Sequence, residues 1–128
     1  MSCPYFYPTE SRGGSATLPL GDFWTGECRA GERAVPTGDA TLCNLGYARG
    51  ECPRFPAGEG PDAVRFAVAQ DRGAAVELLY AIERGHYPDG QGTIAVSADG
   101  GASGAPDEVL GRQAAAYAAS YRRRKEAA

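Results

Sequence analysis

Four cysteines constrain this chain more than any other feature, and all of them lie in its first 52 residues. They are Cys3, Cys28, Cys43 and Cys52, separated by 24, 14 and 8 intervening residues. Turn-forming residues crowd the same stretch, since residues 1–61 hold 10 of the 18 Gly and 7 of the 9 Pro. Such a backbone forms few long helices or strands, but it is free to bring distant side chains together. We therefore expect this half to be an irregular wrap around four thiols.

The length predicts a single domain spanning residues 1–128. Within it we expect a loop-rich metal-binding half, 1–61, and a second half, 62–128, made of a small antiparallel sheet and one C-terminal helix. Hydrophobic residues make up 43% of the chain, enough for a small core. The fold class predicted from the sequence is therefore α+β.

Alternation of apolar and polar residues identifies the expected sheet. It predicts strands at 64–68, 76–83 and 93–96, with turns at 71–73 and 88–90. One alternative stays open for 75–84: Ala75, Leu79 and Ile82 also share one helical face, and Ala, Leu and Glu favour a helix.

The expected C-terminal helix begins at Ser103 or Pro106. Its apolar stripe consists of Leu110, Ala114, Tyr117 and Tyr121, which recur at helical spacing and are expected to dock on the sheet. The basic residues at 122–125 suit the negative end of a helix dipole, and this interpretation is preferred to a nucleic-acid or lipid contact.

Charge and hydropathy exclude several classes of function. The net charge of −3 leaves no broad basic face for nucleic acid. The first residues lack the basic start and apolar run of a signal peptide, and no apolar run reaches the roughly 20 residues that cross a membrane. We expect a cytoplasmic protein with no membrane partner. Thiols stay reduced in that compartment, so the cysteines are expected to be metal ligands or a redox site.

Three interpretations of the cysteines compete. Zinc sites usually contain short C-x2-C pairs, which this chain lacks. Iron–sulfur clusters accept more varied spacings, and Cys3-Pro4 and Cys52-Pro53 resemble the Cys-Pro that closes the bacterial ferredoxin motif. A [4Fe-4S] cluster on all four cysteines is therefore the first prediction, with [2Fe-2S] open as a cluster type. Zinc on the same residues is the alternative, followed by disulfides and unligated thiols.

The segment between Cys43 and Cys52 carries Asn44 and two glycines, Gly46 and Gly50. Residues of this kind allow close backbone approach, and backbone N–H groups aimed at sulfur help to set the potential of a cluster. Gly26, before Cys28, is expected to act in the same way. Arg49 or Arg54 is a further candidate influence on the potential, and the nearby aromatic residues are expected to exclude water.

No other part of the sequence points to catalysis. His86 is the only histidine and lies beside a predicted turn, where a surface position is expected. No motif of the G-x-S-x-G type provides a nucleophile. The sequence thus predicts a non-enzymatic protein that exchanges one electron with a redox partner protein. The alternative function is a zinc-stapled structural or protein-interaction module.

Overall fold

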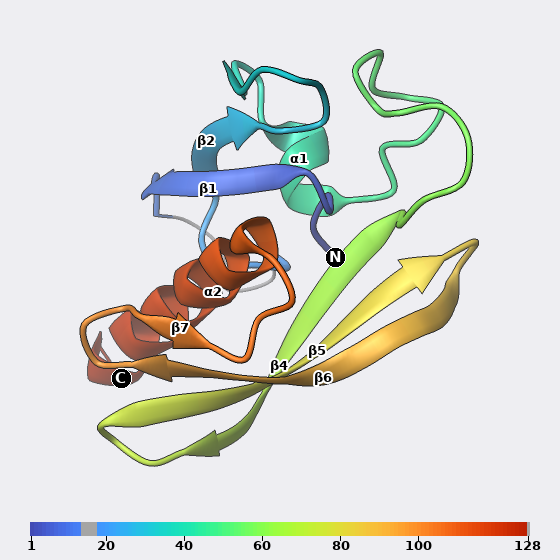
Figure 1. The fold of residues 1–128 in the computed structure, drawn as a ribbon. Helices are drawn as coiled ribbons and strands as arrows, with labels where there is room; N and C mark the ends of the chain where they lie inside the picture. The colour runs from blue at the N-terminus through green and yellow to red at the C-terminus, as the bar shows by residue number, and fades with distance from the viewer. Residues whose placement is uncertain (14–17, 128) are drawn as a thin grey trace.

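The second half of the chain forms a four-stranded antiparallel sheet in the order β4-β5-β6-β7 (Figure 1). The structure is a computed structural model that describes residues 1–13 and 18–127. The strands of this sheet are β4 (Ala63–Asp71), β5 (Ala75–Arg84), β6 (Tyr87–Ser97) and β7 (Ala102–Ser103). Segment 75–84 is thus a strand and not a helix. Val76 and Leu78 are fully buried on the face toward the core, as the alternation predicted.

The β5–β6 turn falls earlier than the sequence predicted. Arg84 pairs with Tyr87, which leaves Gly85 and His86 as a two-residue connection with φ of 54° and 69°. Two successive positive φ angles are typical of the type I′ turn, whose twist matches that of a hairpin. The predicted turn at 88–90 is wrong, because these residues lie inside β6.

The first half contains a second antiparallel sheet, in the order β1-β2-β3, and a short helix. These elements are β1 (Phe6–Ser11), β2 (Trp24–Cys28), β3 (Val35–Pro36) and α1 (Thr41–Leu45). The expectation of an irregular wrap is wrong for these segments. Gly26 pairs with Pro8 across β1 and β2, and a Cβ at Gly26 would lie 2.0 Å from the Tyr7 carbonyl oxygen. Gly26 therefore allows β1 and β2 to approach each other closely and does not end a strand.

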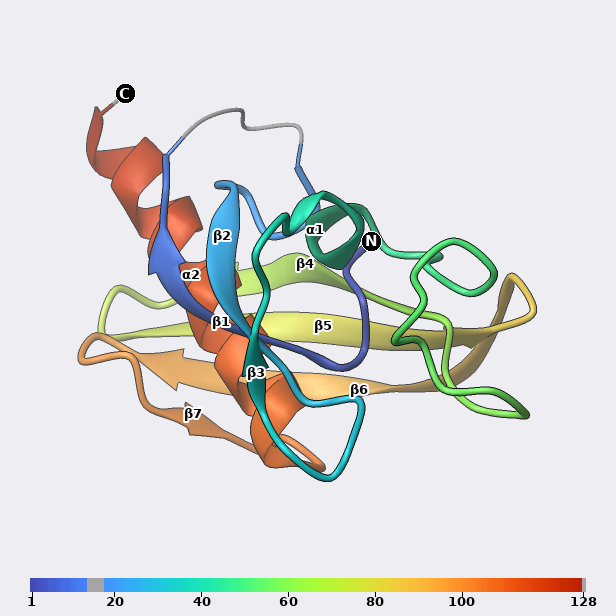
Figure 2. The ribbon, with the colours of Figure 1, turned by 90° about the horizontal axis from the view of Figure 1, so that it is seen from above.

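The C-terminal helix α2 (Glu108–Ala127) runs between the two sheets (Figures 1 and 2). Its first turn is capped by Asp107, whose Oδ1 accepts a hydrogen bond of 2.8 Å from the Leu110 N–H, so it begins later than predicted. Leu110 and Ala114 of the predicted stripe are buried. The helix faces β1 as well as the larger sheet, and the core draws on both halves of the chain.

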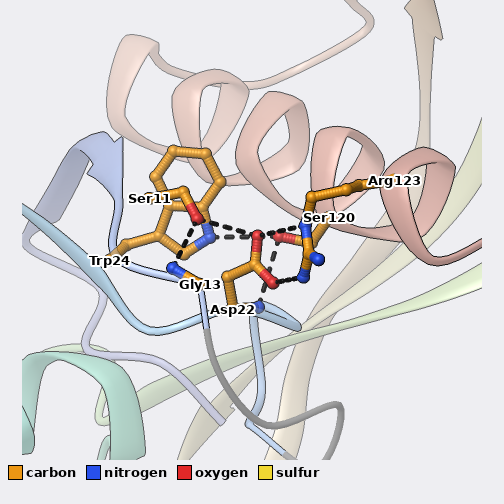
Figure 3. Close-up of polar contacts among 6 residues, drawn as sticks. All are labelled: Ser11, Gly13, Asp22, Trp24, Ser120 and Arg123. Carbon is orange, nitrogen blue, oxygen red and sulfur yellow. Dashed lines mark hydrogen bonds and ion pairs between the residues drawn. The ribbon is translucent and has the colours of Figure 1, made fainter. Parts of the chain in front are cut away.

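The far end of α2 is tied to the first sheet by a buried polar network (Figure 3). Arg123 forms an ion pair with Asp22, which is only 2% exposed. Ser120 Oγ accepts hydrogen bonds from Trp24 Nε1 at 3.2 Å and from the Asp22 N–H at 3.3 Å, and Ser11 Oγ donates to Asp22 at 2.8 Å. The basic helix end thus serves specific tertiary contacts. Neither helix in the described part of the chain is long and apolar enough to cross a membrane.

Candidate metal centre

The four cysteines line a single pocket where β1, β2, α1 and the loop after α1 meet. The other lining residues are mostly apolar: Tyr5, Phe6, Ala30, Leu42, Ala48, Arg54 and Phe55. The enclosed space among these side chains is small, about 20 Å³. Each cysteine reaches the pocket from a different segment of the chain, so the fold brings together residues that the sequence separates.

Cys3 and Cys43 are held together through their backbones. The Cys3 N–H donates a hydrogen bond of 2.9 Å to the Cys43 carbonyl oxygen. The preceding residue, Ser2, exchanges two backbone hydrogen bonds with Val64 at 2.7 and 2.9 Å, which fixes this segment to β4. Cys43 lies in the short helix α1. The position of both cysteines therefore depends on the larger sheet as well as on the first half.

Cys28 and Cys52 complete the pocket from the other side. Cys28 ends β2 and pairs with Phe6 of β1. Cys52 lies in a turn after α1, where its N–H donates to the Ala48 carbonyl at 2.8 Å and its own carbonyl accepts from Phe55 at 3.0 Å. This second bond brings the Phe55 ring over the pocket, where its edge meets Tyr5 with centroids 5.5 Å apart.

Asn44 has a role different from the one expected, whereas Gly46 has the expected close backbone approach, toward Met1. The Asn44 side chain is fully buried and clamps α1 to β2, donating to the Trp24 carbonyl at 2.8 Å and accepting from the Trp24 N–H at 3.0 Å. Gly46 has φ of 77°, and a Cβ there would lie 2.5 Å from the Met1 carbonyl oxygen. Both residues therefore position the loop that carries Cys43, and only the structure could show this.

Burial and the neighbouring cysteines make the Cys3 and Cys43 thiols hard to ionise. Burial, together with the neighbouring cysteines, raises the pKa of Cys3 to about 12, although a hydrogen bond with the Tyr5 backbone opposes the shift. The pKa of Cys43 rises to about 11 for the same main reasons, burial and then the charges of Cys28 and Cys52. Four thiolates could share this pocket only with a cation among them.

Of the remaining sequence candidates, Arg54 lines the pocket and the others do not. His86 is exposed, as predicted, and stacks on Tyr47 with ring centroids 4.8 Å apart. Arg49 forms an ion pair with Asp62 at 2.6 Å, whereas Arg54 contacts Cys28 Sγ. The four cysteines form no disulfide. Within residues 1–13 and 18–127, no three Cys, His, Asp or Glu side chains are close enough to hold a single metal ion.

The fold and this pocket define a small α+β protein with four gathered cysteines. No protein-family model, curated protein or solved structure matches the chain.

Proposed function

We propose that Cys3, Cys28, Cys43 and Cys52 together hold an iron–sulfur cluster of the [4Fe-4S] type, and that the protein transfers single electrons to a partner protein. The observation that carries this proposal is the convergence of all four cysteines on one pocket. Cys28, Cys43 and Cys52 come from a strand, a helix and a turn. Packing alone gives no reason for four thiols to share a pocket.

The electrostatics of the pocket support a bound cationic group. Ionised sulfurs repel one another there, which contributes to the raised pKa values of Cys3 and Cys43. A metal centre reverses this penalty, because its positive charge stabilises thiolates and binding releases their protons. Cys3 and Cys43 are thus suited to a metal-bound state and poorly suited to an ionised, metal-free one.

The lining of the pocket is compatible with a cluster. The aromatic rings of Tyr5, Phe6 and Phe55 line it, and such rings shield inorganic sulfide from water.

Electron transfer is the chemistry that this ligand set supports. Four cysteines on four irons leave no iron open to a substrate, so the group would gain or lose one electron without breaking bonds. Cys28, Cys43 and Cys52 are only partly buried, and the cluster would therefore lie near enough to the surface for a partner to approach. Reduced thiols and an oxygen-sensitive cluster also fit a cytoplasmic location.

Anaerobic purification followed by measurement of iron, zinc and acid-labile sulfide tests the proposal. We expect about four irons and four sulfides per chain, a brown colour and bleaching with dithionite. Single Cys→Ser substitutions at the four positions should each lower the iron content strongly. Leu45→Ser is the matched control, because Leu45 lies on α1 beside Cys43, is 48% exposed and does not line the pocket.

A colourless protein with one zinc and no sulfide would overturn electron transfer and support the zinc-stapled module instead. If any one of the four Cys→Ser variants kept the full metal content, the shared four-ligand site would be wrong.

A further inference from the structure

Arg54 contacts one sulfur atom of the candidate centre directly. Arg54 lies two residues after Cys52, and its Nε–H donates a hydrogen bond to Cys28 Sγ at 3.5 Å. The side chain thus links the last cysteine segment to the end of β2. Arg54 lines the pocket and is exposed to solvent, so its guanidinium lies at the pocket mouth.

The other two arginines near the pocket are neutralised by partners. Arg29 forms ion pairs with Glu27 at 3.2 Å and with Glu108 at 3.4 Å. Arg49 forms an ion pair with Asp62 at 2.6 Å and donates to the Gly58 carbonyl oxygen at 2.6 Å.

Arg54 differs from both. Within the described residues it forms no ion pair with a carboxylate. Its guanidinium is therefore available to the sulfur that it contacts.

The backbone leaves space for this contact. A Cβ at Gly31 would lie 3.6 Å from Arg54 Nη2, so the guanidinium packs beside the loop that follows Cys28. A guanidinium is planar and always charged, and its Nε–H has a fixed direction. Its hydrogen bond to sulfur is charge-assisted, and such bonds are stronger than those between neutral groups.

We propose that Arg54 is a positioning residue that raises the reduction potential of the centre through Cys28. This inference rests on the proposed function and names the residue that would set the reduction potential. In the reduction step the partner protein loses one electron and the cluster gains it, with no bond made or broken. The reduced cluster carries one more negative charge, part of it on the cysteine sulfurs. The cation beside Cys28 therefore stabilises the reduced form more than the oxidised form.

A redox titration of the loaded protein, followed by absorbance, tests this assignment in wild type, Arg54→Gln, Arg54→Lys and Arg33→Gln. At the wild-type midpoint we expect the ratio of reduced to oxidised Arg54→Gln to fall about tenfold, equivalent to about 59 mV for one electron. Arg54→Lys keeps the charge without the Nε–H and should fall in between. Arg33→Gln is the control, because Arg33 is an exposed arginine of the same region that does not line the pocket. Equal midpoints for Arg54→Gln and wild type would overturn the assignment.

A second measurement decides the matter where Arg54→Gln takes up no cluster. In the metal-free proteins, the rate of alkylation of Cys28 at pH 7.5 or about that value is followed by peptide mass mapping. We expect slower alkylation of Cys28 in Arg54→Gln than in wild type, with the rate at Cys52 unchanged. Equal Cys28 rates would overturn the contact. Wild-type protein without iron and sulfide would instead overturn the proposed function, and the alkylation rates would still test Arg54 against Cys28.

Discussion

Gln113 of α2 donates a hydrogen bond of 2.8 Å from its Nε2 to the carbonyl oxygen of Cys3, across 110 residues of sequence. The same nitrogen donates to the Phe6 carbonyl at 2.7 Å, and Gln113 Oε1 accepts from Ser2 Oγ at 2.6 Å. All of these groups are buried. The C-terminal helix therefore holds the segment that brings the first cysteine to the pocket, and the two halves of the chain depend on each other.

Replacement of Gln113 by Leu should destabilise the protein by about 3 kcal/mol, because the change removes three buried hydrogen bonds, to Ser2 Oγ and to the carbonyl oxygens of Cys3 and Phe6. The free energy of unfolding in urea measures this effect. Gln91→Leu is the matched control: Gln91 is exposed on β6, and a change within about 0.5 kcal/mol is expected there. Equal urea midpoints for the two variants would show that the Gln113 contacts contribute nothing.

Apolar periodicity was the part of the sequence that predicted structure correctly. The periods of 76–83 and of Leu110 to Tyr121 predicted a strand and a helix, and both exist, because burial of one face imposes a local period. Gln113 has no such signal. Its polar side chain is buried in the protein core, where it donates to backbone carbonyls more than 100 residues away in the sequence.

The missed first sheet has a related cause. β1 contains Pro8 and β2 contains Gly26, and both residue types argue against a strand when the sequence is considered locally. In the structure these two residues lie opposite each other in the sheet. The cysteines themselves could be singled out from the sequence, since their type and number point to a shared site. Arg54 and Arg49 were equivalent candidates until the structure showed which of them contacts sulfur.

Gly26→Ala should destabilise the protein by about 3 kcal/mol or more, because the added methyl group collides with the backbone of β1 and no side-chain rearrangement relieves it. Thermal unfolding followed by circular dichroism measures the change. Gly31→Ala is the comparison, since its Cβ would meet only one atom, at 3.6 Å, in ordinary van der Waals contact. Should Gly26→Ala unfold at the wild-type temperature, the close approach of β1 and β2 is wrong.

Asp22 should make stability depend on acid. Burial alone would raise the pKa of its carboxyl group, but hydrogen bonds from Arg123 and Ser11 outweigh burial and lower it. A lowered pKa in the folded state stabilises the protein above the unfolded value of about 3.9, and this stabilisation disappears as the pH falls below that value. The stability difference between wild type and Asp22→Asn is therefore expected to be largest near pH 7 and to shrink toward pH 2.

Urea unfolding at several pH values measures this difference. Asp89→Asn serves as the control, because the ion pair between Asp89 and Arg84 is exposed and such pairs contribute only about 0–1 kcal/mol. A difference between wild type and Asp22→Asn that stays constant from pH 7 to pH 2 would contradict the role given to the Asp22 network (Figure 3).

Under the proposed function, removal of the metal centre should make the stability of the folded protein fall in alkali. In the metal-free fold the pKa of Cys3 is about 12 and that of Cys43 about 11, against about 8.5 in an unfolded chain. Because the folded state favours the protonated thiols, their contribution is complete below about pH 8.5 and is lost as the pH rises toward 11. In the loaded protein the thiols have already given up their protons to bind the metal, so no such loss is expected in this range.

Urea unfolding of loaded and metal-free protein between pH 7 and about 11 tests this expectation. Tyr47 and Tyr121 also have raised pKa values, so their ionisation lowers the stability of the protein in alkali in both forms. A third sample is therefore needed to separate the contribution of the thiols. Metal-free Cys3→Ala provides it, since the variant lacks the thiol with the largest shift and should decline less steeply than metal-free wild type. Parallel declines in all three samples would mean that the buried thiols do not resist ionisation, and the electrostatic argument for a metal centre would fail with them.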